Sequence, residues 1–144
     1  MNPVLHLSAA GSLRRAFTPL LETFSQRYGI AITPTFGPAG LLSERIIQGD
    51  EADLFASANC AHPLRLKSLG LAEETALFTR NQLCIVMRNI PELTRQSWLM
   101  ALRDPRFILS TSTPGSDPGG DYAVQLFERI EHLHRGWGIA LRER

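Results

Sequence analysis

The sequence predicts an α/β fold in which helices cover both faces of a parallel sheet. Short apolar runs alternate with longer segments whose apolar residues recur every three or four positions. Gly29 and Gly70 close two of the helical segments, as expected of helix C-termini. The resulting order is strand, helix, strand, helix, strand, helix, which is typical of parallel sheets. With 144 residues, the chain can bury a sizeable core as one domain or two small lobes.

The first strand and helix form the strongest of these signals. A strand is predicted over Val4–Ser8, and the apolar run that contains it ends at Gly11. A helix is predicted to begin at Ser12, with Ser12 as its N-cap. This junction would leave free N–H groups and the positive end of the helix dipole at the carboxyl edge of the sheet, which is a site for an anion. Many α/β domains contain the same junction without a ligand. The helix extends to Tyr28, and its predicted apolar face is Leu13, Phe17, Leu20, Leu21, Phe24 and Tyr28.

The second and third strands follow in the same way. An extended segment over 30–36 contains Pro34, which predicts an edge strand or a bend, and a tight turn over 37–40 leads into the next helix. That helix has Leu41, Leu42, Ile46 and Ile47 as its apolar face. A third strand over 53–57 and a short helix over 63–69 complete the first lobe.

The pattern changes after Gly70. We predict strand over 76–78 and 83–87, a helix over 94–102, a strand over 107–110, a loop over 110–120 and a final helix over 121–133, and no clear element beyond it. These signals divide the chain into a first lobe over 1–77 and a second lobe over 78–144.

Composition excludes several classes of function. A net charge of +1 gives no strong attraction to nucleic acid or to a membrane surface, and no apolar run is long enough to span a bilayer. Cys60 and Cys84 fit no metal or redox spacing, and His132 and His134 point to different sides of a helix. No motif for nucleophilic, metal-dependent or phosphate-transferring catalysis is present. We therefore expect no enzyme, no metal and no cofactor.

Four motifs, each at a predicted strand-to-helix junction, resemble those of one known family. They are Ser8-Ala9-Ala10-Gly11-Ser12-Leu13, Phe36-Gly37-Pro38-Ala39-Gly40-Leu41-Leu42, Ala52-Asp53-Leu54-Phe55-Ala56-Ser57-Ala58-Asn59 and Asp117-Pro118-Gly119-Gly120-Asp121-Tyr122-Ala123. Their order and spacing are similar to those of ModA-type molybdate-binding proteins, the extracytoplasmic solute-binding subunits of ABC transporters. The resemblance covers about residues 4 to 128.

The resemblance implies a type II binding-protein fold, with two lobes that have parallel-rich sheets. A tetrahedral oxyanion, molybdate or tungstate, would lie between the lobes and be held by hydroxyls and backbone N–H groups. The implied partner is the transporter permease, and the implied compartment is the periplasm. The cytoplasm stays open, because the N-terminus lacks the features of a secretory signal.

Carried over residue by residue, Ser12 matches the first ligand serine of the family. Its second serine falls at Ala39, so a hydroxyl is lost while backbone N–H groups remain. Asp117 and Asp121 flank the later loop and would disfavour a dianion unless they turn outward. The residues expected to hold the anion are Gly11, Ser12, Ala39, Gly40, Ser57 and Gly119.

Family members continue well past the length of this sequence, so the resemblance implies a truncated C-terminus and an incomplete second lobe. An unfinished sheet edge would favour a dimer or a higher species. Two alternatives stay open beside transport: an effector-sensing domain of a transcription regulator, and a remnant that folds or oligomerises but binds no ligand. An enzyme of the phosphate-handling kind ranks below both.

Overall fold

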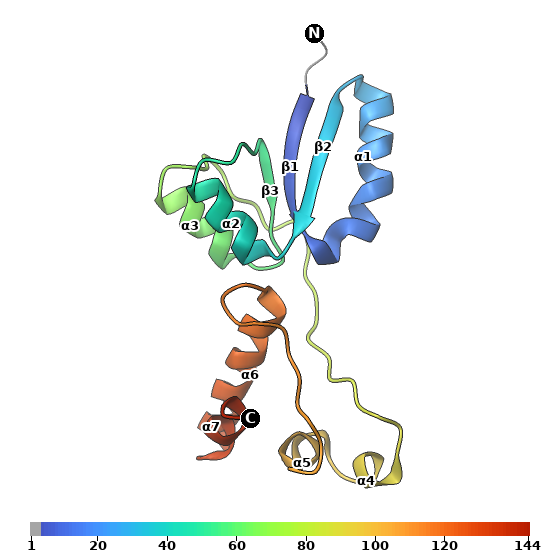
Figure 1. Ribbon diagram of the computed structural model, residues 1–144, viewed down its shortest axis with the longest axis vertical. Helices are drawn as coiled ribbons and strands as arrows, with labels where there is room; N and C mark the ends of the chain where they lie inside the picture. Colours follow the sequence, from blue (N-terminus) through green and yellow to red (C-terminus); the bar gives the residue numbers. More distant parts are fainter. Residues whose placement is uncertain (1–3) are drawn as a thin grey trace. The chain divides into compact units, whose positions relative to one another are not determined.

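The computed structural model describes residues 4–144 and shows two compact units. Within this range, the first unit runs to Thr79 and also includes Gly115–Pro118, and the second consists of Arg80–Pro114 and Gly119–Arg144 (Figure 1). The sequence places the boundary after Leu77 and does not predict that Gly115–Pro118 rejoins the first unit. The fold class is mixed α/β, as the sequence predicts.

The first unit is built on a parallel sheet of three strands. These are β1 (Val4–Ala10), β2 (Ala31–Gly37) and β3 (Leu54–Ala56), in the order β2-β1-β3. Pro34 lies on the edge strand β2, opposite Leu7, so the predicted edge position is confirmed. The Asp53 carboxylate accepts the N–H of His6 at 2.7 Å, and its own N–H donates to the His6 carbonyl at 2.9 Å, which joins the start of β3 to β1.

Helices cover both faces of the central strand β1. Leu7 and Ala9 are buried against Leu13, Phe17 and Leu21, which belong to the 3₁₀ turn η1 (Gly11–Leu13) and to α1 (Arg14–Tyr28). Side chains alternate along a strand, so Ser8 and Ala10 face the other way. Both are buried on that face, where α2 (Ala39–Ile47) contacts β1 and α3 (Ala61–Ser68) contacts α2. The predicted parallel sheet with helices on both faces is confirmed for this unit.

Two details of the first helix differ from the prediction. Ser12 is not an N-cap, because it lies inside η1, and no side chain caps η1 or α1. The apolar face is narrower than predicted, since Leu20 and Tyr28 are each 57% exposed. Gly29 ends α1 in the left-handed region at φ 67°, as the sequence indicates.

The regular elements of the second unit are all helices within its described residues. It contains α4 (Pro91–Thr94), α5 (Trp98–Arg103), most of α6 (Pro118–Leu133) and α7 (Trp137–Arg142). The predicted helix over 94–102 is two short helices, because Ser97 starts a new one by accepting the N–H of Met100. The final helix begins three residues earlier than predicted, at Pro118 rather than Asp121, and α7 lies where no element is expected.

The strands predicted over 76–78, 83–87 and 107–110 are wrong, and so is the parallel sheet expected in the second lobe. All three segments lie within the described residues, and none of them pairs with another strand. Their apolar side chains are largely exposed, including Leu77 and Phe78 in the first unit and Val86 and Ile108 in the second. A strand needs a hydrogen-bonded neighbour, and among residues 4–144 these segments have none.

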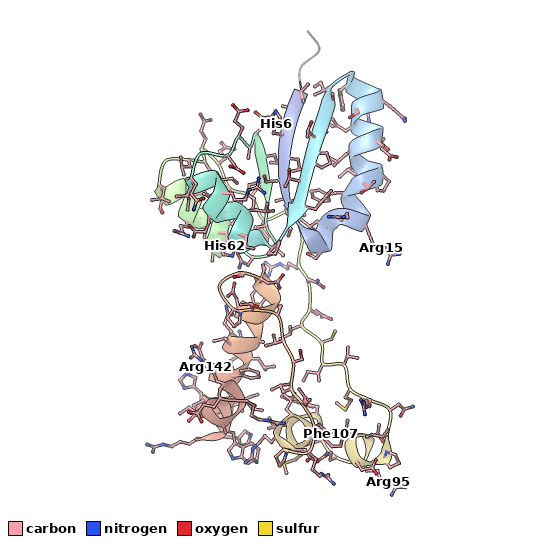
Figure 2. The ribbon with its side chains drawn as sticks, viewed as in Figure 1. His6, Arg15, His62, Arg95, Phe107 and Arg142 are labelled. Carbon is pink, nitrogen blue, oxygen red and sulfur yellow. The ribbon has the colours of Figure 1, made fainter. Side chains whose placement is uncertain are left out.

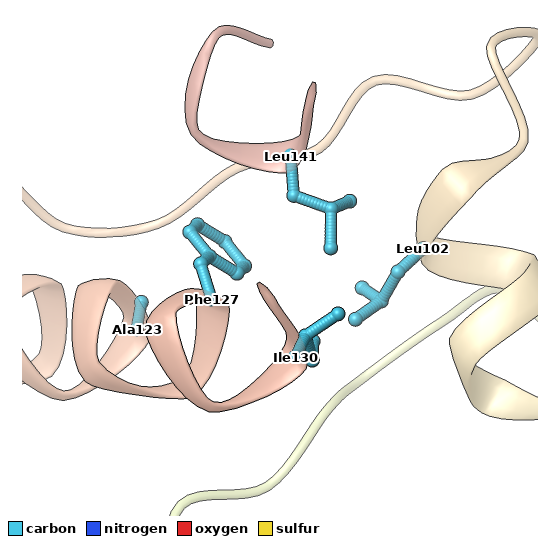
Figure 3. Close-up of a cluster of buried hydrophobic side chains, with 5 residues drawn as sticks. All are labelled: Leu102, Ala123, Phe127, Ile130 and Leu141. Atoms are coloured by element: carbon cyan, nitrogen blue, oxygen red, sulfur yellow. The ribbon is translucent and has the colours of Figure 1, made fainter. Parts of the chain in front are cut away.

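The core of the second unit lies between three helices. Ala123, Phe127 and Ile130 of α6 point toward Leu102 of α5 and Leu141 of α7 (Figure 3). A Cβ at Gly138 would overlap the Phe127 carbonyl oxygen, so a glycine allows α7 to approach α6 this closely. The Glu131 carboxylate accepts the N–H groups of Gly136 at 2.7 Å and Ile139 at 3.1 Å, which fixes the start of α7.

Candidate anion-binding site of the first unit

Two helix starts lie side by side at the carboxyl edge of the sheet. β1 leads directly into η1 and α1, and β2 leads through Pro38 into α2. The strands are parallel neighbours, and their last residues, Ala10 and Gly37, are register partners. Both turns therefore emerge at the same edge, as the sequence predicts from the strand order.

The two turns line one cavity of about 370 Å³. Ala10, Gly11, Ser12 and Arg14 line it from the first turn, Phe36, Gly37, Pro38 and Ala39 from the second, and Asp117 from the loop that rejoins this unit. The structure thus brings three of the six expected anion-binding residues, Gly11, Ser12 and Ala39, to one place.

Backbone amides are available at this cavity because side chains do not cap the helices. Neither η1 nor α2 has a side-chain hydrogen bond at its N-cap. The first amides of a helix have no partner within the helix, so a ligand or water must satisfy them. Pro38 has no N–H, which makes Ala39 the first possible donor of the second turn. Helix N-termini of this kind attract anions through both hydrogen bonds and the helix dipole.

Gly40 differs from its expected role as a donor to the anion. Its N–H donates to the carbonyl oxygen of Ser116 at 3.1 Å. A Cβ at Gly40 would overlap the carbonyl oxygens of Gly115 and Ser116, so only a glycine lets the loop approach the start of α2 this closely. The loop therefore occupies one of the amides that the sequence assigns to the ligand.

Arg14 is a cavity residue that sequence reasoning missed. Its guanidinium carbon lies 5.2 Å from the centroid of the Phe36 ring, and both residues line the cavity. Stacking on an aromatic face restrains a long side chain and leaves the edge of the guanidinium able to donate. Its place in the sequence could have indicated this role, because Arg14 is the first residue of α1 after the turn.

A sequence comparison identifies the family. The chain matches the family of bacterial extracellular solute-binding proteins over residues 5–142. It is a member of that family. An uncharacterized protein of Pasteurella multocida (strain Pm70), PM1146, is 40% identical over 141 residues, which are 97% of this chain and 58% of that protein. An uncharacterized protein of Haemophilus influenzae (strain Rd) is 32% identical over 100 residues, or 69% of this chain and 87% of that protein.

The electrostatics of the cavity in this solute-binding protein are mixed. Arg14 brings a cation, and Asp117, which the sequence predicts to oppose a dianion, lines the cavity too. Asp117 is half-buried in the loop that rejoins the first unit. Two helix starts without side-chain caps and the Arg14 guanidinium would therefore attract an anion in the cavity, and the Asp117 carboxylate would repel it.

Ser57 and Gly119 are not among the residues that line this cavity. Ser57 follows β3, and its hydroxyl oxygen accepts the N–H of Asn59 at 3.2 Å, so it stabilises the turn before α3. Gly119 belongs to the second unit, where it lines a different cavity of about 500 Å³.

The described residues contain neither a cluster of metal-binding side chains nor a membrane-spanning helix. Among residues 4–144, no group of three or more His, Cys, Asp or Glu side chains is arranged to hold a metal ion. His6 on β1 and His62 on α3 are drawn in Figure 2. In the same range, no helix has both the length and the hydropathy needed to cross a bilayer.

Shifted pKa values occur in the second unit and have structural causes. The Arg106 guanidinium donates to Asp104 at 2.9 Å through Nε and holds the pKa of that carboxyl well below its ordinary value of 3.8. The N–H groups of Gly136 and Ile139 donate to the Glu131 carboxylate and lower its pKa as well. Both carboxylates stabilise turns between helices of that unit.

Proposed function

We propose that this solute-binding protein binds a tetrahedral oxyanion, molybdate or tungstate, for uptake by an ABC transporter. In this proposal the chain works outside the cytoplasmic membrane, delivers its ligand to a permease and catalyses no reaction. Membership of the solute-binding family supports ligand binding in a transport context. The choice of anion rests on the resemblance of four motifs to those of ModA-type proteins.

The observation that carries this proposal is the pairing, on one cavity, of two helix starts that have no side-chain cap. Ala10 and Gly37 end neighbouring parallel strands, and the residues that follow them line the same 370 Å³ space. Fixed N–H donors from two directions match a tetrahedral anion better than a planar or a spherical one. Each hydrogen bond to a charged partner contributes roughly 1.5–3 kcal/mol.

A thermal-shift assay with a panel of anions tests the proposal. Molybdate and tungstate should stabilise the folded chain by about 2.7 kcal/mol at a hundredfold excess over the dissociation constant, and nitrate and chloride should not. Ser12→Ala should weaken binding by about 1.5–3 kcal/mol. Ser25→Ala is the matched control, because Ser25 lies in the last turn of α1, the helix that follows η1, and does not line the cavity.

A gain-of-function variant tests the second turn. Ala39→Ser restores the hydroxyl that the ModA-type pattern has at this position, so it should tighten molybdate binding. Ala39 is fully buried, so the melting temperature without ligand must be compared first. The proposal is refuted if no tetrahedral anion stabilises the wild-type chain.

One pair of observations favours a second candidate, a chain that keeps the fold and binds no anion. Asp117 lines the cavity, and the Gly40 N–H is bonded to the Ser116 carbonyl oxygen. Both features make the site less favourable for a dianion. Asp117→Asn separates the candidates. If the cavity binds anions, this variant should bind molybdate more tightly than the wild type does. If the cavity binds no anion, neither the variant nor the wild type should respond to molybdate.

A further inference from the structure

We propose that the first unit binds its oxyanion together with a proton, which is shared between the Asp117 carboxylate and an oxygen of the anion. This inference rests on the proposed function, because it concerns the same cavity. It adds that binding depends on pH, and that Asp117 favours tetrahedral anions that are basic enough to hold a proton. The residues that carry it all belong to the first unit, including the loop Gly115–Pro118.

The first support is the way in which the backbone holds Asp117 at the cavity. Asp117 lines the same 370 Å³ space as the turns that lead into α1 and α2. Its loop is joined to the start of α2, because the Gly40 N–H donates to the Ser116 carbonyl oxygen at 3.1 Å. The approach is so close that a Cβ at Gly40 would overlap the carbonyl oxygens of Gly115 and Ser116. An anion in the cavity therefore meets this carboxylate unless the contact with α2 breaks.

The second support is the balance of charge around the cavity. Among the described residues that line it, the charged side chains are Arg14 and Asp117. Their charges are opposite, so a dianion such as molybdate or tungstate meets no net side-chain charge that would neutralise it. Like charges that share a site favour the uptake of a proton by one of them. The shared proton converts a repulsive pair of oxygens into a short, charge-assisted hydrogen bond.

The third support is that the other charged groups on the neighbouring elements do not line the cavity. On α1, Arg15 is exposed and lies outside it, and Asp121, in the first turn of α6, does not line it either. Arg14 itself keeps its proton at any pH at which the protein is folded. The charged residues of α2 form ion pairs with other partners, Glu44 with Arg65 and Arg45 with Asp50. Asp117 is therefore the lining residue whose proton can be exchanged with a bound anion.

A shared proton also selects among tetrahedral anions by their basicity. Molybdate and tungstate accept a proton more readily than sulfate does. They can therefore form the hydrogen bond to Asp117, whereas sulfate would bring two negative charges beside an ionised carboxylate. This selection acts in addition to any selection by size, and it assigns to Asp117 a direct role in specificity.

Isothermal titration calorimetry of the whole chain with molybdate, between about pH 6 and pH 8, tests this inference. Because the complex takes up a proton, the dissociation constant should rise by about three- to tenfold for each unit of pH. At one pH, the heats measured in two buffers of different ionisation enthalpy should differ, since the buffer supplies the proton. Sulfate should bind much more weakly than molybdate.

Two matched variants assign the proton to Asp117. Asp117→Asn cannot take up a proton, so its dissociation constant should change by less than about twofold for each unit of pH. Asp117→Asn should bind molybdate more tightly than the wild type at the upper end of this range, and the difference should narrow as the pH falls. Its preference for molybdate over sulfate should also decrease. Asp121→Asn removes the same charge outside the cavity and should keep the pH dependence of the wild type.

The possible outcomes separate this inference from the proposed function. If no tetrahedral anion binds at any pH, the proposed function fails and this inference fails with it. If molybdate binds to the wild type with an affinity that does not depend on pH, the proposed function stands and the shared proton is excluded. The inference is also overturned if Asp117→Asn keeps the pH dependence of the wild type. Melting temperatures without ligand show whether each variant is folded.

Discussion

Replacing Arg14 by Gln tests whether a single cation contributes to anion binding in the cavity. The Arg14 guanidinium lies over Phe36 at the cavity, with its carbon 5.2 Å from the ring centroid. A hydrogen bond from this cation to an oxyanion contributes about 1.5–3 kcal/mol, so Arg14→Gln should raise the dissociation constant for molybdate roughly 10- to 150-fold. The stacking on Phe36 contributes only about 0.5–1 kcal/mol to folding at an exposed site, so the variant should stay folded.

The neighbouring arginine provides the control for this prediction. Arg15 projects from the start of α1 (Figure 2) and does not line the cavity. Arg15→Gln removes the same charge at nearly the same place in the chain, so it should change affinity by less than about threefold, through screened long-range attraction alone. Isothermal titration calorimetry of both variants at two salt concentrations measures this. Equal losses in the two variants would refute a specific role for Arg14.

Three further predictions concern stability. Ser43 is fully buried, and its hydroxyl has no hydrogen-bond partner within the described residues, so Ser43→Ala should raise the free energy of unfolding in urea by about 1 kcal/mol. Phe127 is 7% exposed in the core of the second unit, so Phe127→Ala should lower that free energy by about 3–5 kcal/mol, and a loss under 1 kcal/mol would contradict the packing described. Because folding lowers the pKa of Asp104, its stabilising effect is present above the ordinary value of 3.8 and disappears as the pH falls below it. The urea midpoint of Asp104→Asn should therefore fall less steeply than that of the wild type in this acid range.

The first unit could be predicted from sequence because its signals are local. Each strand is a short apolar run, each helix has a periodic apolar face, and Gly29 marks the end of α1. Parallel order follows from the alternation of strands and helices, and that order brings Gly11, Ser12 and Ala39 together. The position of Arg14 was missed because its proximity to Phe36 depends on strand register.

The second unit could not be predicted in the same way, because strands depend on distant partners. Residues 83–87 and 107–110 have the composition of strands and remain unpaired in the described chain. Amino-acid composition indicates that a segment favours a strand when a neighbouring strand is present. It does not indicate whether that neighbouring strand is there. Likewise, the contact of Gly40 with Ser116 joins residues far apart in the chain, and no local pattern indicates it.

Anomalous diffraction from crystals grown with stoichiometric tungstate, in the absence of sulfate and phosphate, tests the central proposal most directly. Tungsten scatters strongly enough to locate a single bound ion. The proposal predicts one peak in the cavity of the first unit, within hydrogen-bonding reach of the turns that contain Gly11, Ser12 and Ala39, with its oxygens near Arg14. A peak elsewhere on the chain, or no peak at saturating tungstate, would contradict it.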